Sequence, residues 1–321
     1  VLAWEDRSLY RVPIDGSEAS VVLHSLSDPW QFEGPVTATP DSTRALFVVR
    51  AVAARQLWSI RVDGSSAPVL LAGLGALYQY KVSPDSSQVV YMSYDSGQET
   101  LFSVPVDGSS APLQISGAAG EMVDFELTGD GLWVVYIASS PLHDELYSTR
   151  VDGSTGPRKL NRVLPFGGDV TAFDLPASGP FVAYRADQEV DQRFELYSAS
   201  VDGSTSTLRI GGENPPHADV LEFQVDPSGA GVYFRIDRDA DEAYQLFAVG
   251  FEGTEPPLEV SGPRVAGGSV QPGWALSPSD GRVVFVADAL IDEHFQLFST
   301  SVSGARVLLS DRARGSVANR W

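Results

Sequence analysis

Three loops of this chain share a pair of aspartates four residues apart, the first of them nine residues before a leucine. The pairs are Asp187 and Asp191, Asp237 and Asp241, and Asp288 and Asp292. Carboxylates at a fixed spacing in a polar loop suit a hard cation such as Ca²⁺, with backbone carbonyls and water completing the coordination shell. The middle loop, which adds Asp239, copies the opening of a calcium loop but lacks the glycine and distal glutamate of an EF-hand. We therefore treat these seven aspartates as candidate Ca²⁺ ligands.

A structural alternative accounts for the same spacing. The first aspartate of each loop can cap it by accepting backbone N–H bonds, while the aromatic residue at position 194, 244 or 295 packs over it. The sequence leaves both interpretations open.

Two further aspartates, Asp169 and Asp219, end long polar segments at 161–169 and 211–219. Each is followed by a valine that opens an apolar run, so we expect both carboxylates near the mouth of a central channel in the fold derived below. An acidic funnel there would attract a cationic ligand or peptide. The alternative is that both are solvated loop ends.

The element that positions these loops is a phrase repeated seven times. It reads LYRVPIDGS from Leu9, LWSIRVDGS from Leu57, LFSVPVDGS from Leu101, LYSTRVDGS from Leu146, LYSASVDGS from Leu196, LFAVGFEGT from Leu246 and LFSTSVSG from Leu297. The copies start about 44 to 51 residues apart, the period expected of a four-stranded propeller blade.

One period shows four strands. Apolar, β-branched runs at 77–82, 88–93, 101–106 and 112–115 are separated by turn residues. Asp107-Gly108 supplies the positive φ that a tight hairpin needs. Each period therefore predicts one antiparallel blade of four strands.

The chain ends complete the count. Residues 1–4 read as a second strand without a first, and residues 316–321 as a first strand without a second. Joining them gives a closing blade from about 1–26 plus 316–321, which leaves no exposed sheet edge. We predict an all-β, single-domain, seven-bladed β-propeller over residues 1–321.

An S-P-D-type turn, an apolar strand and then L-[YF]-x-x-x-V-D-G-S resembles the TolB-type propeller repeat, a bacterial relative of the WD-repeat. The resemblance covers nearly the whole chain, although the amino-terminal helical domain of TolB has no counterpart here. It implies a scaffold or binding role in the periplasm or outside a bacterial cell. Such blades also form the gating domains of prolyl-oligopeptidase-type enzymes.

Composition excludes several classes of function. The formal charge of −20 would repel a nucleic acid backbone, and no apolar run reaches the roughly 20 residues that cross a bilayer. The chain has no cysteine, so disulfides, thiolate metal sites and cysteine nucleophiles are absent. We expect a monomer without membrane insertion.

Two functions remain from different classes. The first is a non-catalytic binding propeller that presents an acidic loop face to a protein or small cationic ligand. The second is a lyase or hydrolase acting in the funnel, with or without a metal ion. No G-x-S-x-G motif is present, and the four histidines show no ligand spacing. A third alternative is that this chain is the propeller portion of a larger polypeptide.

Overall fold

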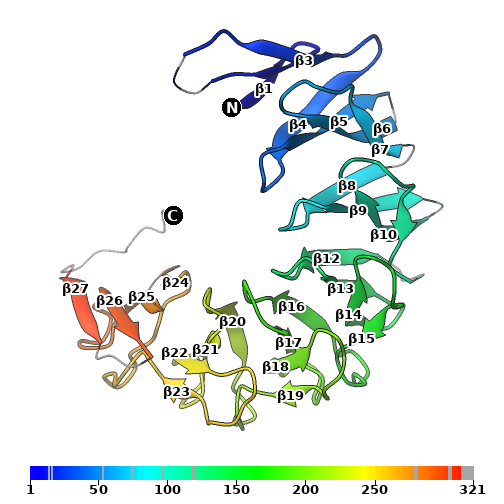
Figure 1. Cartoon of the computed structure of the whole chain (residues 1–321). Helices are drawn as coiled ribbons and strands as arrows, with labels where there is room; N and C mark the ends of the chain where they lie inside the picture. Colours follow the sequence, from blue (N-terminus) through cyan, green and yellow to red (C-terminus); the bar gives the residue numbers. More distant parts are fainter. Residues whose placement is uncertain are drawn as a thin grey trace. The chain divides into compact units, whose positions relative to one another are not determined.

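The computed structural model describes residues 1–311 apart from 14, 16, 53, 74–75, 96, 118–120, 278–280 and 303–305. In this part of the chain the strands form seven antiparallel sheets, which follow one another along the sequence (Figure 1). They are the blades of a seven-bladed β-propeller, as the repeat predicts. Over the same residues, no helix is long and apolar enough to span a membrane.

The chain divides into two compact units. Unit 1 comprises Val1–Ser139 with Thr149–Pro157, and unit 2 comprises Ser140–Ser148 with Arg158–Trp321. We number the sheets 1 to 7 in chain order. Sheets 1 to 3 belong to unit 1, sheets 5 to 7 belong to unit 2, and sheet 4 contributes strands to both.

Over the described residues, the first four sheets contain fifteen strands, and within each sheet neighbours in sequence are neighbours in space. Sheet 1 contains β1 (Leu2–Glu5), β2 (Ser8–Arg11) and β3 (Val21–Ser25). Sheet 2 contains β4 (Gln31–Ala38), β5 (Arg44–Ala51), β6 (Ala54–Arg61) and β7 (Val69–Gly73). Sheet 3 contains β8 (Ala76–Val82), β9 (Gln88–Asp95), β10 (Gln98–Pro105) and β11 (Leu113–Gln114). Sheet 4 contains β12 (Met122–Leu127), β13 (Trp133–Ser139), β14 (Asp144–Arg150) and β15 (Arg158–Lys159).

In the part of the chain that the structure describes, the last three sheets contain twelve strands in the same order. Sheet 5 contains β16 (Val170–Asp174), β17 (Phe181–Ala186), β18 (Glu195–Ser200) and β19 (Leu208–Arg209). Sheet 6 contains β20 (Val220–Val225), β21 (Val232–Ile236), β22 (Gln245–Val249) and β23 (Leu258–Glu259). Sheet 7 contains β24 (Ala275–Leu276), β25 (Arg282–Ala287), β26 (Gln296–Ser301) and β27 (Val307–Asp311).

Within the described residues, sheet 1 has three strands. The strand predicted to complete it, residues 316–321, lies outside the described residues. Closure of the propeller by the two chain ends, and the single domain that follows from it, therefore stay predictions.

The V-D-G-S phrase forms the turn between the third and fourth strands. Its aspartate carboxylate accepts the backbone N–H of the serine two residues on. The glycine inside four of these turns has a positive φ, such as 74° at Gly64; the four are Gly64, Gly108, Gly153 and Gly203. The pairs are Asp15 and Ser17, Asp63 and Ser65, Asp107 and Ser109, Asp152 and Ser154, and Asp202 and Ser204. Five of the chain's carboxylates are thus used locally, to close turns.

The core combines stacking within sheets and packing between them. The aromatic residue after the repeat leucine stacks on an aromatic residue of the neighbouring second strand, as Tyr184 does with Tyr197 at 5.4 Å between ring centroids. In unit 2, Phe247 and Phe251 of sheet 6 pack in one cluster with Leu196 of sheet 5. The regular aromatic position therefore has a partner in its own sheet as well as the inter-blade role that its spacing predicts.

Candidate functional site

The three aspartate-pair loops occupy equivalent places in unit 2. They are residues 187–194, 237–244 and 288–295, each connecting the second strand of its sheet to the third. The first aspartate of each loop, Asp187, Asp237 or Asp288, has a relative exposure of only 1% to 4%. A buried carboxylate needs hydrogen-bond donors, and its partners define its role.

Each buried aspartate accepts two backbone N–H bonds, one per carboxylate oxygen. Asp187 accepts from Asp169 N at 2.6 Å and from Gln192 N at 2.8 Å. The corresponding donors are Asp219 N (2.9 Å) and Glu242 N (3.3 Å) to Asp237, and Ser269 N (2.6 Å) and Glu293 N (3.1 Å) to Asp288. We call this arrangement the aspartate clasp. It is the capping role that the sequence offered as the alternative to metal binding.

The second amide of each clasp comes from a strained residue. Gln192, Glu242 and Glu293 have φ values of 62°, 61° and 56°, in the left-handed region that non-glycine residues rarely adopt. The hydrogen bond to the buried carboxylate holds each of them there. The fixed spacing of the first aspartate is therefore explained by loop geometry.

Asp169 and Asp219 connect each clasp to the preceding sheet. The carboxylate of Asp169 accepts from Asp144 N at 2.7 Å, and that of Asp219 accepts from Phe194 N at 2.7 Å. In sheet 7 the hydroxyl of Ser269 does the same for Tyr244 N at 3.1 Å. One residue thus donates its own N–H to its sheet's clasp and accepts an N–H from the sheet before.

Asp219 is electrostatically unusual. Burial raises its pKa above the ordinary value, and the nearby Asp237 carboxylate adds to the rise, although the hydrogen bond from Phe194 N opposes it. Placement at the mouth of a channel, expected for Asp169 and Asp219, stays a prediction.

The remaining candidate residues lie at the loop tips. Asp191, Asp239, Asp241 and Asp292 are all exposed. Asp239 forms an ion pair with Arg264 at 3.0 Å. Among the described residues, no group of three His, Asp or Glu side chains is arranged to hold a metal ion. The Ca²⁺ assignment consequently rests on the loop composition and stays a prediction.

Exposed apolar side chains accompany these acidic tips, a feature that the sequence analysis missed. Val163 and Phe166 are 83% and 88% exposed, and Val190, Leu290 and Ile291 are 46% to 58% exposed. Phe166 precedes Gly167, where an added Cβ would lie only 3.0 Å from Asp191 Oδ2. An apolar tip and an acidic tip are therefore neighbours on one face.

Unit 1 holds a cavity of about 720 Å³ along β4 and β8. The charged side chains of its lining are paired with one another or with a neighbour. Arg55 donates to both carboxylate oxygens of Glu33, at 2.7 and 2.9 Å, and Lys81 forms an ion pair with Glu126. This cavity was not predicted from the sequence, because its lining strands have the same apolar pattern as the other repeats.

The histidines do not assemble a catalytic group in the described part of the chain. His24 lies in β3 beside Phe47, and burial lowers its pKa. His143 Nδ1 lies 2.8 Å from the carbonyl oxygen of Gly168 and fastens one loop to another. His217 is exposed in the segment before Asp219. The funnel enzyme considered from the sequence gains no support from these positions.

Comparisons with known proteins show the fold. No protein-family model matches the chain, and no curated protein matches it. A prolyl endopeptidase structure matches with a TM-score of 0.53 and 16% identity over 95% of this chain and 46% of that one. A puromycin hydrolase structure matches with a TM-score of 0.50 and 17% identity over 97% and 50% of the two chains. A protein described as TolB from Agrobacterium tumefaciens has a TM-score of 0.42 and 17% identity over 81% and 91%.

This chain spans about half the length of the endopeptidase and hydrolase that it matches. At these identities the likeness shows a β-propeller and no narrower family. Membership of the TolB-type family stays a prediction from the repeat.

Proposed function

We propose that this chain is a non-catalytic binding propeller that uses the loop face of sheets 5 to 7 to take up a basic partner protein. The observation that supports this most directly is the composition of the loop tips. Seven exposed carboxylates stand on three successive loops: Glu189, Asp191, Asp239, Asp241, Glu242, Asp292 and Glu293. Ion pairs to Arg209 and Arg264 engage two of them, Glu189 and Asp239.

The clasps support a binding role because they fix the loops before any partner arrives. Each tip stands on a buried carboxylate with two hydrogen bonds, so little backbone entropy is lost on association. The exposed rings and aliphatic side chains, Phe166 above all, supply apolar contact area beside the charges. A partner with basic and apolar side chains is complementary to this face.

The proposal includes the cellular location and the oligomeric state that the sequence analysis led us to expect. It places the protein in the periplasm or outside a bacterial cell, as a monomer that needs no cofactor to bind. Calcium at the loop tips is a separate proposal, tested below.

A random peptide library displayed on phage tests the proposed function. We expect selection on this protein to enrich lysine or arginine together with aromatic or aliphatic residues. A triple variant, Asp191→Asn with Asp241→Asn and Asp292→Asn, should bind the selected peptides at least about tenfold more weakly. Phe166→Ala should also weaken peptide binding, and by the same factor at low and high salt concentration, because the contribution of Phe166 is apolar.

A matched control distinguishes the face from general charge attraction. Glu5→Gln with Glu18→Gln and Glu121→Gln removes the same number of exposed carboxylates from unit 1. Its binding should stay within about twofold of the unmodified protein. Equal losses in the two triple variants, or selected peptides without basic residues, would contradict the proposal.

A further inference from the structure

Sheet 6 contains a cavity of about 350 Å³ at the end of the sheet remote from the aspartate clasps. Its lining includes Gly231, Ala248 and Gly250 from the second and third strands and the turns beside them, together with the ring of Tyr233. This volume lies in the range of about 300 to 1,000 Å³ typical of small-molecule sites. The lining is unusual when it is compared with the equivalent places in the other sheets.

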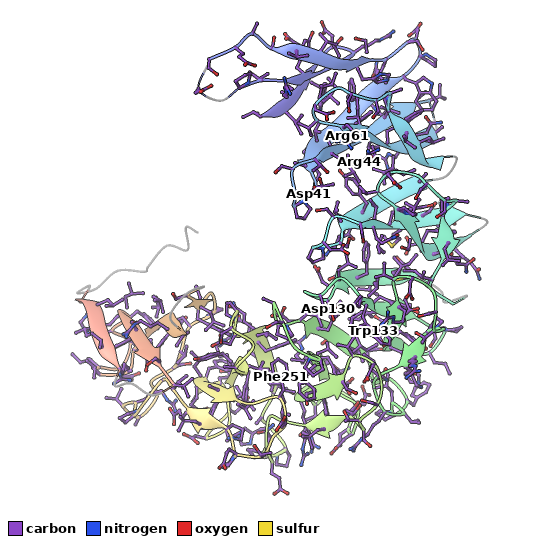
Figure 2. The ribbon with its side chains drawn as sticks, in the orientation of Figure 1. Asp41, Arg44, Arg61, Asp130, Trp133 and Phe251 are labelled. Carbon is purple, nitrogen blue, oxygen red and sulfur yellow. The ribbon has the colours of Figure 1, made fainter. Side chains whose placement is uncertain are left out.

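The register identifies the residues equivalent to Gly231. It precedes Val232, which pairs with Val249, so Gly231 faces Gly250. In sheet 2 the same position holds Arg44, opposite Arg61, and in sheet 3 it holds Gln88, opposite Pro105. In sheet 7 it holds Arg282, opposite Ser301. Sheets 4 and 5 place Trp133 and Phe181 there; Arg44, Arg61 and Trp133 are labelled in Figure 2.

A long polar side chain fills this place in three sheets and binds a side chain on the third strand. Arg44 Nε donates to Ser59 Oγ at 2.8 Å, and Arg282 Nε donates to Ser299 Oγ at 2.9 Å. In sheet 3 the hydroxyl of Ser103 donates to Gln88 Oε1 at 3.2 Å.

In sheet 6 both members of that pair are lost together. Glycine replaces the long side chain at 231, and Ala248 replaces the serine opposite it in the pattern. The cavity therefore lies, by register, at the repeat position that these side chains occupy in the other sheets.

The electrostatics of the cavity favour a cation. Two acidic residues, Asp226 and Glu255, are among its lining residues, and the described lining contains no lysine, arginine or histidine. Asp226 is only 5% exposed, and its Oδ1 accepts from Ser228 N at 2.8 Å and Ser228 Oγ at 2.6 Å. Tyr233 closes one side, where its hydroxyl donates to the carbonyl of Gly281 at 3.2 Å.

We propose that this cavity binds a small guanidinium or amidinium compound with an apolar body. The ligand supplies the group that Arg44 and Arg282 supply in their own sheets. Its cation faces Asp226 and Glu255, and its apolar body lies against Ala248, Pro256 and Leu258. The site is independent of the loop face, because it lies at the other end of sheet 6.

Titration with three molecules of nearly equal shape tests the charge preference. Benzamidine is the cation, benzamide its neutral counterpart and benzoate the anion. By isothermal titration calorimetry we expect saturable benzamidine binding, with benzamide at least about tenfold weaker and benzoate weaker still. Glu255→Gln should reduce the difference in affinity between benzamidine and benzamide.

Refilling the cavity tests the location. An added Cβ at Gly250 would meet nothing within 4 Å, whereas one at Gly231 would lie 2.4 Å from the carbonyl oxygen of Val249. Gly250→Leu is therefore the suitable change, and it should abolish benzamidine binding while leaving the melting temperature unchanged or higher. Gly156→Leu, at a glycine of unit 1 with equally open surroundings, should bind as the unmodified protein does.

A Gly-Arg-Gly peptide amide distinguishes two sources of the same cation. Tighter binding of the peptide than of benzamidine would identify an arginine of a partner protein as the natural occupant, and weaker binding would identify a free small molecule. The proposal is wrong if the folded protein binds neither probe, if it binds benzoate as well as benzamidine, or if Gly250→Leu leaves binding unchanged.

Discussion

The connections between second and third strands differ between the early and the late sheets. In sheets 2 and 3 the strands meet in tight hairpins, where Ala51 pairs with Ala54 and Asp95 pairs with Gln98. In sheets 5 to 7 the same connection is a long loop, such as 187–194, built on an aspartate clasp. A hairpin satisfies its amides through the strand ladder, whereas a long loop turns amides inward and needs an acceptor there.

Sheet 4 is intermediate between the two forms. Its connection is closed by Ser140, whose N–H and hydroxyl both donate to the carbonyl of His143, at 2.7 and 2.9 Å. A serine is sufficient for a short loop that stays near solvent. The longer loops need two acceptor oxygens, and a buried carboxylate provides them in one side chain.

The largest effect should come from removing a clasp. Asp187→Ala leaves the amides of Asp169 and Gln192 without their acceptor, so we expect a loss of about 3 kcal/mol in the free energy of unfolding. Asp191→Ala removes an exposed carboxylate from the same loop and should change it by less than about 0.5 kcal/mol. Urea unfolding measures both, and equal losses would mean that the clasp has no special role.

A glycine pair should separate backbone strain from crowding. Gly167 and Gly97 have φ values of 85° and 88°, but only Gly167 lies against a carboxylate, that of Asp191. We expect Gly97→Ala to cost about 1 kcal/mol and Gly167→Ala about 2 kcal/mol. Thermal unfolding gives the difference, which should shrink when Asp191→Ala is added to Gly167→Ala.

Acid titration should give opposite signs for two aspartates. Hydrogen bonds from Thr39 and Thr43 lower the pKa of Asp41 to about 2. This carboxylate therefore stabilises the fold above the unfolded pKa of about 3.9, and its contribution disappears as the pH falls through about 2. Asp41→Asn should be less stable than the unmodified protein at pH 7 and equal to it at the acid end.

Asp219 should behave in the opposite way, because its pKa is raised in the folded state. The native state then holds its proton longer than the unfolded chain does, so stability falls as the pH rises above about 3.9. The Asp219→Asn variant has no carboxyl group to titrate at this position. As the pH rises above about 3.9, it should therefore lose less stability than the unmodified protein does. Melting temperatures across the acid range would decide both cases, and parallel curves would contradict them.

The smallest effect should be that of calcium. Asp239 and Asp241 are exposed and Asp237 is already bound to two amides, so we expect Ca²⁺ affinity no tighter than about 0.1 mM. Calorimetry on chelator-treated protein measures it, and Asp239→Asn with Asp241→Asn should remove the heat. An absence of heat in the unmodified protein would end the calcium proposal.

The repeat predicted the sheets because local chemistry specifies them. Alternating apolar residues and V-D-G-S turns need no distant partner, and the strands of sheet 3 lie close to the predicted ranges. Capping by the first aspartate was also foreseeable, since its acceptor reaches the amide five residues later, as in Asp187 and Gln192. Its second donor, Asp169 N, lies on a separate loop and depends on how that loop folds back.

The apolar tips and the sheet 6 cavity were not foreseen for different reasons. An apolar residue in a loop, such as Phe166, looks the same in sequence whether it packs inward or projects. Gly231 and Gly250 read as ordinary turn glycines until strand register aligns them with Arg44 and Arg61.

The double role of Asp169 and Asp219 bears on how such a chain can grow. Each repeat of this type contains two acceptor side chains. One binds amides of its own loop, and the other binds an amide of the sheet before it. A tandem duplication of such a repeat would therefore produce a copy that can form these hydrogen bonds with the sheets on both sides of it. In sheet 7, Ser269 stands where sheets 5 and 6 have Asp169 and Asp219, and it still accepts the amide of the sheet before. The acceptor between sheets can therefore differ while the buried aspartate of the clasp is retained.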